Sequence, residues 1–339
     1  MCCERRASYD APATIQWGHL PLAGDEAMRW GHLPLAGESG AMGRSVVIRE
    51  VSLRDGLQIE KPIPLSAKLE LLAAVAATGV REVEATAFVS PTKVPSMADA
   101  AELAAELQHY PDIDFSALVA SPNGARRAVA AGLRSIEYVV AASDAFSQAN
   151  VGRSSAQATE HISEIVAIAR DSDVSVEVIV AVAWDCPFEG PTPPGRVLDI
   201  AAAARDSGVD RLCIADTIGT TTPGRVRSLI AQLRPVIGEL PLGGHFHNTR
   251  GAGLASAYAA VEAGVTRLDA SAGGLGGCPF APGATGNIAT EDLVYLLRDS
   301  DIDVDIDLQA AIAAARVATT IVGHDLPSAL LHAGDRIAR

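Results

Sequence analysis

From residue 46 onward, the chain alternates between two hydrophobic patterns. Short runs rich in β-branched residues alternate with longer stretches in which Ala and Leu recur at helical spacing. The eight apolar runs that predict strands are residues 46–51, 81–86, 114–119, 135–142, 174–183, 211–216, 242–247 and 266–271. Clear amphipathic stretches between them are residues 66–77, 97–108, 158–170, 196–207 and 252–263. This alternation predicts βα units on a parallel sheet.

Eight βα units within residues 46–300 predict one α/β domain, a (β/α)8 (TIM) barrel, whose usual length is about 250 residues. A doubly wound open sheet is the alternative, but no GxGxxG phosphate-binding turn follows the first strand. Two further helical patterns, residues 308–318 and 327–333, predict C-terminal helices that pack on the barrel. We therefore divide the chain into an N-terminal extension (1–43), a barrel (44–300) and C-terminal helices (301–339).

The predicted extension contains a short duplication. The octapeptide WGHLPLAG occurs at residues 17–24 and again at 30–37, and an Ala-Met pair follows each copy closely. Two short copies are too few to stack as a solenoid, which needs at least about three repeats. We expect this extension to be disordered and to carry no site residue, and we hypothesise that Met42 is the natural start.

Composition and charge narrow the class of protein. Of the 339 residues, 48% are hydrophobic and 20% are charged, which excludes a disordered chain. The net charge of −14 would repel a nucleic-acid backbone, and no apolar run approaches the length of a membrane helix. The five cysteines show no CxxC pairing, which argues against disulfides and structural zinc. With neither a secretory signal nor a peroxisomal C-terminal tripeptide, we expect a cytoplasmic protein without nucleic-acid or membrane partners.

Reactive residues collect where a barrel has its active site, at the C-terminal ends of the strands. His245 and His247 lie two residues apart on the seventh strand, so both imidazoles can face the same side. The alternative is that one faces solvent and the other is a core histidine. With Asp55 at the end of the first strand and Asn287 near the eighth, four ligands can converge. This nitrogen and oxygen set suits Mg²⁺ or Mn²⁺, although Zn²⁺ or Co²⁺ could bind more tightly in vitro.

Three further charged residues belong to the same region. Arg54 would place a permanent cation beside the metal, or would instead form a salt bridge to Asp216 or Glu84. Glu84 and Asp216 lie at inward-facing strand ends, where a carboxylate needs a cation, a water or a proton-transfer role. Either carboxylate could instead orient a ligating histidine.

The segment 273–287 follows the eighth strand and is rich in glycine and proline. We expect it to act as a mobile lid that brings Cys278 into the site as an acid when substrate binds. Cys186, in the sequence WDCPFEG, is the rival thiol.

Several motifs together resemble the 3-hydroxy-3-methylglutaryl-CoA lyase family, within the wider group of metal-dependent lyase and condensing-enzyme barrels. The resemblance covers residues 46–309. The motifs that carry it are RDGLQ (54–58) followed by Glu60 and Lys61, EATAFVSPTKVP (84–95), CPFEG (186–190), ADTIGTTTPG (215–224), HFHNTRG (245–251) and GGLGGCPFAPGATGNIATEDLVYLL (273–297).

The resemblance implies a role for each matching residue. The metal ligands that it implies are Asp55, His245, His247 and Asn287. It implies that Arg54 polarises the substrate carbonyl, that Cys278 is the thiol of the lid, and that Asp216 and Glu84 are active-site carboxylates. It places Gln58 beside the metal-binding turn and Lys61 at a position that contacts the coenzyme A phosphates. The implied reaction is the retro-Claisen cleavage of a 3-hydroxy-3-alkylglutaryl-CoA to acetyl-CoA and a 3-oxoacid. His245 and Asp216 both remain candidates for the base.

Some positions depart from the family pattern. The chain has HNTRGAG where the familiar lyases have HDTYGQ, and it has Ala87 and Cys213 where serines are expected. The loss of hydroxyl groups makes an enzyme for a longer 3-alkyl analogue a real alternative. Others are a condensing enzyme or aldolase of the same superfamily, and a catalytically silent barrel. We expect an acyl-CoA substrate, a homodimer and a role in pathways such as leucine catabolism.

Overall fold

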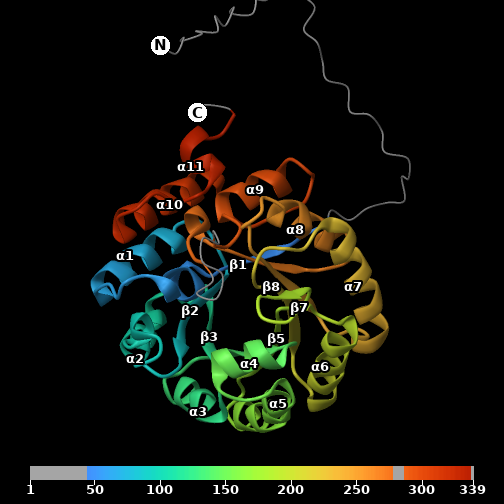
Figure 1. Ribbon diagram of the computed structural model, residues 1–339. Helices are drawn as coiled ribbons and strands as arrows, with labels where there is room; N and C mark the ends of the chain where they lie inside the picture. Colours follow the sequence, from blue (N-terminus) through green and yellow to red (C-terminus); the bar gives the residue numbers. More distant parts are fainter. Residues whose placement is uncertain (1–43, 278–285, 337–339) are drawn as a thin grey trace, which may run out of the picture. The chain divides into compact units, whose positions relative to one another are not determined.

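Eight parallel strands close into a barrel in the computed structural model, which describes residues 44–277 and 286–336 (Figure 1). The barrel strands are β1 (Val47–Glu50), β2 (Glu82–Phe88), β3 (Asp114–Val119), β4 (Ser135–Ala141), β5 (Ser175–Ala181), β8 (Arg211–Asp216), β9 (Leu242–Phe246) and β10 (Arg267–Ala270). Their order around the barrel is β1-β10-β9-β8-β5-β4-β3-β2. All eight predicted strands are confirmed, and their ends differ from the predicted ones by at most two residues. The predicted extension, residues 1–43, lies outside the described residues.

Helices surround the barrel (Figure 1). They are α1 (Leu65–Ala76), α2 (Ala100–Glu106), α3 (Pro122–Ala130), α4 (Asp144–Val151), α5 (Ser155–Arg170), α6 (Pro194–Ser207), α7 (Pro223–Ile237), α8 (Gly253–Glu262), α9 (Thr290–Arg298), α10 (Leu308–Val322) and α11 (Ala329–Ala333). Local sequence sets their ends: Ser154 and Gln157 form a capping box at the start of α5, and Gly208 ends α6 in a left-handed conformation. No helix among the described residues is long and apolar enough to cross a membrane.

A small antiparallel hairpin interrupts the βα pattern after β5. It consists of β6 (Asp185–Cys186) and β7 (Gly190–Pro191). The hydrophobic pattern does not predict this hairpin, because strands of two residues are too short to show a period of two.

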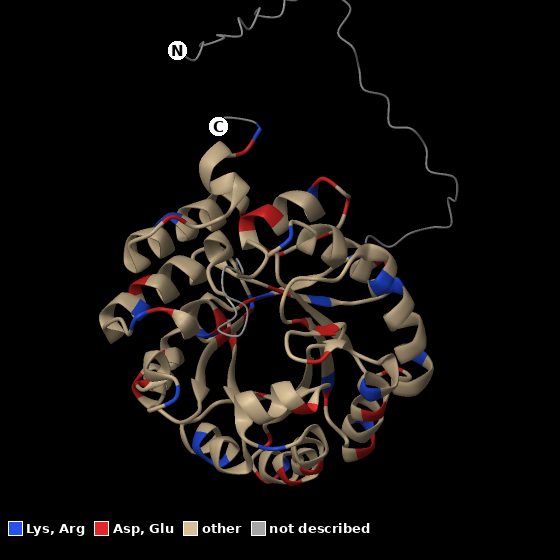
Figure 2. Ribbon diagram, in the orientation of Figure 1, with Lys and Arg blue, Asp and Glu red and all other residues tan. Residues whose placement is uncertain are grey.

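The barrel strands carry charge as well as apolar side chains. Leu and Val side chains on the strands pack with those of the helices into one large core. Figure 2 shows charged positions on the barrel strands in addition to those on the outer helices. The buried acidic, basic and histidine residues of these strands are Arg49, Glu50, Glu84, Glu137, Glu177, Asp216, His245, Arg267 and Asp269. A barrel interior is usually filled by branched apolar residues, so this set calls for a functional explanation.

Hydrogen bonds connect the C-terminal segment to α9 and to Gly273, the first residue of the glycine-rich segment 273–287. Helix α10 packs against α1 and α9. The Asp292 carboxylate, at the start of α9, accepts hydrogen bonds from Ser328 Oγ and from the Leu330 backbone N–H, at 3.0 and 2.8 Å. The backbone N–H of Ser328 donates to the carbonyl of Gly273, and both carboxylate oxygens of Glu291 lie 3.1 Å from the Gly273 nitrogen.

Glu291 generates a prediction about the pH dependence of stability. Burial raises the pKa of Glu291 from 4.5 to about 7, although hydrogen bonds to its carboxylate oppose the shift. Because the pKa is higher in the folded than in the unfolded protein, stability falls as pH rises from 4.5 towards 7. We expect Glu291→Gln to remove this loss, which amounts to roughly 3 kcal/mol.

Urea unfolding of the parent and of the variant over that pH range measures the effect. Glu70→Gln, a change of an exposed glutamate on α1, is the control and should leave the profile unchanged. Parallel stability profiles of the parent and Glu291→Gln would contradict the prediction.

Candidate active site

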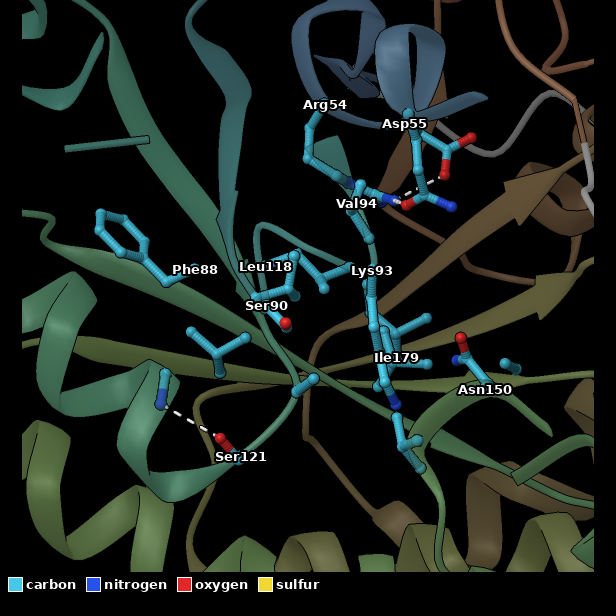
Figure 3. Close-up of a pocket in the computed structure, with 18 of the residues that line it drawn as sticks. Arg54, Asp55, Phe88, Ser90, Lys93, Val94, Leu118, Ser121, Asn150 and Ile179 are labelled. Carbon is cyan, nitrogen blue, oxygen red and sulfur yellow. Dashed lines mark hydrogen bonds and ion pairs between the residues drawn. The ribbon is translucent and has the colours of Figure 1, made fainter. Parts of the chain in front are cut away.

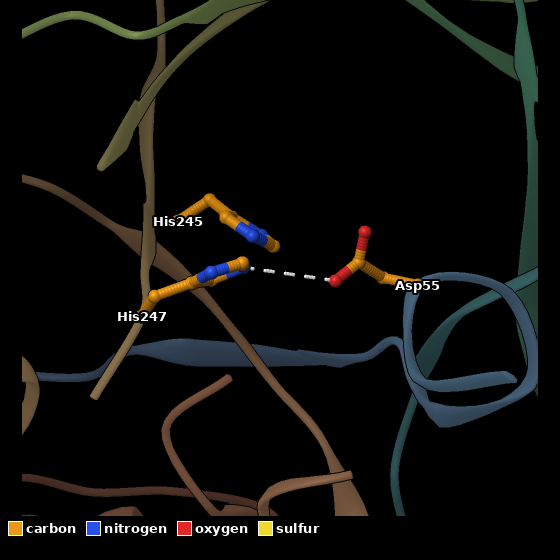
Figure 4. A group of neighbouring side chains, drawn as sticks. All are labelled: Asp55, His245 and His247. Atoms are coloured by element: carbon orange, nitrogen blue, oxygen red, sulfur yellow. Dashed lines mark ion pairs between the residues drawn. The ribbon is translucent and has the colours of Figure 1, made fainter. Parts of the chain in front are cut away.

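Asp55, His245 and His247 come together at the C-terminal end of the barrel (Figure 4). His245 lies on β9 and His247 directly follows it, whereas Asp55 lies on a single π-helical turn, Ser52–Gly56, after β1. One ligand atom from each residue lies within 4.8 Å of those of the other two. His247 Nε2 is 3.8 Å from Asp55 Oδ2, and the two imidazole centroids are 5.0 Å apart. Asp55 is therefore not on the first strand, but on a turn directed towards the two histidines.

Unpartnered polar atoms show that these residues fit a divalent cation. Both ring nitrogens of His247 and the Oδ1 atom of Asn287 are buried without a hydrogen bond. Asn287 Nδ2 donates to Asp55 Oδ2 at 2.9 Å and to the Leu275 carbonyl at 3.0 Å, which fixes the amide beside the carboxylate. Buried polar atoms normally have partners, because leaving them unsatisfied costs about 1–3 kcal/mol each. Two imidazoles, a carboxylate and an amide oxygen are suitable ligands for Mg²⁺ or Mn²⁺.

Arg54 is held beside this cluster by two carboxylates. Its Nη1 lies 2.6 Å from Asp55 Oδ1 and 3.2 Å from Gln58 Oε1, and its Nη2 lies 2.6 Å from Glu84 Oε2. Burial works against the charged guanidinium, but Glu84 and Asp55 raise the pKa of Arg54 above its ordinary value. Burial would also raise the pKa of Asp55, yet Arg54 and the imidazoles hold it well below its usual range. The cluster thus presents a fixed cation and a fixed anion side by side.

Glu84 differs from Asp55 in its electrostatic environment. Its side chain is completely buried on β2. Burial raises the pKa of Glu84 well above its ordinary value; Arg54 opposes the shift, and the neighbouring Glu137 carboxylate adds to it. The two carboxyl groups bound to Arg54, Glu84 and Asp55, therefore have pKa values that are displaced in opposite directions.

The other residues singled out in the sequence occupy different places. The Asp216 carboxylate accepts hydrogen bonds from the backbone N–H groups of Thr220 and Thr221, and burial raises its pKa although these bonds oppose the shift. Lys61 is exposed and does not line the cavity that contains Arg54, Asp55 and the two histidines. Cys278 lies outside the described residues, whereas its neighbour Gly277 lines the cavity.

The cluster lies in a cavity of about 440 Å³ that extends from Asp55 and the two histidines across β2–β5 and β8 (Figure 3). Arg54, Asp55, His245 and His247 all line it. Apolar side chains make up much of the remaining wall; among them are Leu118, Val139, Ile179, Ala181 and Ala215, which all lie on barrel strands. Cys213 packs with Ile179, Ala215 and Val139 in a small apolar cluster.

Basic residues from three different segments line the rim of the cavity. Lys93 follows β2, Arg127 lies on α3, and Arg153 precedes α5. Lys93 and Arg127 are exposed, and Arg153 is half-buried. The cavity is therefore lined by these three basic side chains in a chain whose net charge is −14.

Sequence analysis missed four charged residues that lie behind the site. They are Arg49, Glu137, Glu177 and Asp269. Glu137 and Glu177 are each the single charged residue of an otherwise apolar strand, and this is the signal that could have found them. Arg49 and Asp269 each share a short strand with a second charged residue. The Asp269 carboxylate contacts His245 directly, with Oδ2 3.0 Å from Nδ1.

The ligand geometry predicts the effect of removing one imidazole. We expect His247→Ala to lower the affinity for Mn²⁺ by at least about 100-fold, because even residues that only support a ligand contribute 10- to 100-fold. Titration of Mn²⁺, followed by the electron paramagnetic resonance signal of the free ion, measures this loss. His324→Ala removes an exposed histidine that pairs with Glu60, and it should leave the affinity unchanged. A His247→Ala variant that binds one equivalent as tightly as the parent would refute the assignment.

Comparisons with known proteins agree with this architecture. The HMGL-like family model matches residues 45–318. The mitochondrial hydroxymethylglutaryl-CoA lyase of Bos taurus is 37% identical over 276 residues, which are 81% of this chain and 85% of the relative. The 3-hydroxy-3-isohexenylglutaryl-CoA/hydroxy-methylglutaryl-CoA lyase of Pseudomonas aeruginosa is 36% identical over 281 residues, which are 83% of this chain and 94% of the relative.

A solved structure shows the same relationship. An HMG-CoA lyase from Acinetobacter baumannii, in complex with coenzyme A and 3-methylmalate, is 37% identical to this chain, with a TM-score of 0.84. The match covers 89% of this chain and 99% of that structure. The chain therefore belongs to the HMGL-like family.

Proposed function

We propose that this protein is a metal-dependent carbon-carbon lyase that cleaves 3-hydroxy-3-methylglutaryl-CoA to acetyl-CoA and acetoacetate. The observation that carries the proposal is the convergence of a carboxylate, two imidazoles and an amide beside a buried guanidinium. Relatives named for this reaction, 36–37% identical over four-fifths of the chain, support it. The cytoplasmic location, the homodimeric state and the role in leucine catabolism stay predictions.

The metal ligands of this proposal are Asp55, His245, His247 and Asn287. A bound Mg²⁺ or Mn²⁺ would supply a Lewis acid that favours ionisation of the substrate's tertiary hydroxyl group. The unpartnered nitrogens of His247 and the unpartnered Oδ1 of Asn287 support this ligand set.

The chain's own residues account for the remaining charge and proton movements. The hydroxyl group loses its proton to Asp216, because His245 is engaged by Asp269 at Nδ1 and offers Nε2 to the metal in this proposal, which leaves it no free nitrogen. The bond between C2 and C3 then breaks. The hydroxyl carbon becomes the ketone of acetoacetate, and the electron pair of the broken bond passes to the acetyl-CoA enolate. Arg54, held by Glu84 and Asp55, is oriented to stabilise the negative charge on the thioester oxygen. Cys278 is the proposed acid that returns a proton to the enolate.

The apolar wall of the cavity extends the proposal to longer 3-alkyl groups. Ile179, Ala181 and Ala215 line the cavity that also contains His245, and they offer no hydroxyl group to a polar substituent. Ala87 and Cys213, where the family pattern has serines, are both buried apolar side chains here. A substituent larger than methyl can therefore be accommodated by contact with apolar surface.

The basic rim is the proposed binding region for the coenzyme A phosphates. Lys93, Arg127 and Arg153 line the cavity from separate segments, and an acyl-CoA must place its phosphates outside while its thioester reaches Arg54. Arg and Lys are the side chains best suited to phosphate recognition. In this proposal the rim takes the role that the sequence resemblance implied for Lys61.

An acetyl-CoA release assay tests the reaction, the substrate range and the metal together. We expect cleavage of 3-hydroxy-3-methylglutaryl-CoA and of longer 3-alkyl analogues, loss of both activities with a chelator, and recovery with Mg²⁺ or Mn²⁺. Ala181→Leu should narrow the cavity and lower kcat/KM for the longest analogue about tenfold more than for the methyl substrate, which serves as the control.

The opposite results would identify another function. Acetyl-CoA consumption with a 2-oxoacid, in place of release, would favour a condensing enzyme. No turnover of any substrate by the metal-loaded protein would favour the silent barrel.

If the basic rim binds the phosphates, removal of its charges should weaken substrate binding and leave the rate of bond cleavage unchanged. We expect Lys93→Gln combined with Arg127→Gln to raise KM for the acyl-CoA about tenfold and to leave kcat nearly unchanged, since an exposed ionic contact contributes about 0.7 kcal/mol and tenfold corresponds to about 1.4 kcal/mol. Added salt should weaken binding to the parent more than to the variant. Arg126→Gln, on the same helix but paired with Glu164 and outside the cavity lining, is the matched control. An equal KM in the parent and the double variant would contradict the assignment.

A further inference from the structure

Arg49 is the centre of a charged cluster enclosed by the barrel. Its side chain is only 2% exposed. Nε and Nη2 bind the two carboxylate oxygens of Asp269 at 2.9 and 2.7 Å, while Nη1 lies 2.5 Å from Glu137 Oε1 and 2.6 Å from Glu177 Oε2. Arg267 pairs with Glu177 from another direction. One guanidinium therefore holds three carboxylates in fixed positions.

Stability alone does not explain this cluster. Buried ion pairs lose about as much in desolvation as they gain in attraction, and apolar residues of similar volume often stabilise a protein at least as well. The geometry of the cluster gives Asp269 a fixed position, because Arg49 Nε and Nη2 bind both of its carboxylate oxygens. A carboxylate that is fixed by two bonds to Arg49 can orient a third group.

That third group is His245. Strand register places Arg49, Asp269 and His245 side by side on the neighbouring strands β1, β10 and β9. Asp269 Oδ2 lies 3.0 Å from His245 Nδ1 and 2.7 Å from Arg49 Nη2. A carboxylate only accepts hydrogen bonds, so the bond requires the proton of a neutral His245 to be on Nδ1. The Nε2 lone pair is then free.

The two site histidines differ in this respect. Neither ring nitrogen of His247 has a hydrogen-bond partner among the residues that the structure describes, whereas His245 is bound through Nδ1. A histidine that ligates a metal commonly donates its other N–H to a carboxylate, which fixes its tautomer and orientation. Among the described residues of this site, only His245 has such a support.

We propose that Asp269, clamped by Arg49, is a positioning residue that holds His245 with its proton on Nδ1 and with Nε2 directed to the metal site. The proposal rests on the proposed metal site, but concerns a residue that contacts neither the metal nor the substrate. It assigns a function to the charged cluster: Arg49 immobilises the carboxylate that immobilises the ligand.

Nitrogen-15 NMR of the histidine rings tests the proposal in the intact, metal-free parent protein. At mildly alkaline pH we expect His245, assigned by comparison with His245→Gln, to be protonated on Nδ1. A His245 ring that is protonated mainly on Nε2 would overturn the proposal. Because this measurement needs neither metal nor substrate, its outcome is independent of whether the protein is a lyase.

The variant Asp269→Asn tests the consequence for the ligand. We expect a mixed tautomer of His245 and a 10- to 100-fold loss of Mn²⁺ affinity, with partial recovery in Asp269→Glu. Glu177→Gln is the matched control, because it removes another carboxylate from Arg49 without touching His245. Equal Mn²⁺ affinities in Asp269→Asn and Glu177→Gln would show that Asp269 has only a structural role. If Asp269→Asn does not fold, the NMR result on the parent still decides the proposal.

Discussion

The ion pairs between the buried Arg49 guanidinium and three carboxylates are the interactions on which the rest of the structure depends. A carboxylate placed alone inside a barrel would lose its hydration and either destabilise the fold or take up a proton. Arg49 meets Asp269, Glu137 and Glu177 at hydrogen-bonding distance, so these carboxylates can be buried. Burial would raise the pKa of Glu137, but Arg49 holds it below its ordinary value. Fixed negative charge is thereby available directly behind the site.

Two series of side-chain contacts connect the Arg49 cluster to the residues of the proposed active site. On one side, Asp269 contacts His245. On the other, Glu137 adjoins Glu84, which in turn binds Arg54. Both series meet near Asp55, which contacts Arg54 and lies next to the two imidazoles. Groups held in this way need little reorganisation when charge develops on a substrate, and this preorganisation is a large part of enzymatic rate enhancement.

The hydrophobic pattern of the sequence predicted the barrel strands, because these strands are buried on both faces and therefore appear as nearly continuous apolar runs. It was a poorer guide to the position of Asp55. The chain leaves β1 after Glu50 and forms a π-helical turn, in which Gly56 packs closely against Leu275 from a distant segment. The single charged residues Glu137 and Glu177 were visible in the sequence. Their partner Arg49 was not, because it lies 88 and 128 residues away along the chain.

The sequence by itself determined the number and order of the βα units and singled out the residues proposed as metal ligands, because hydrophobic periodicity and short motifs are local properties. Only the tertiary structure decided which cation each buried carboxylate meets and which histidine is held in one tautomer. Those pairings follow from the register of strands around a closed barrel, which places Arg49, Asp269 and His245 in one row although Arg49 and Asp269 are 220 residues apart. Register depends on the packing of the whole barrel, so no local pattern in the chain specifies it.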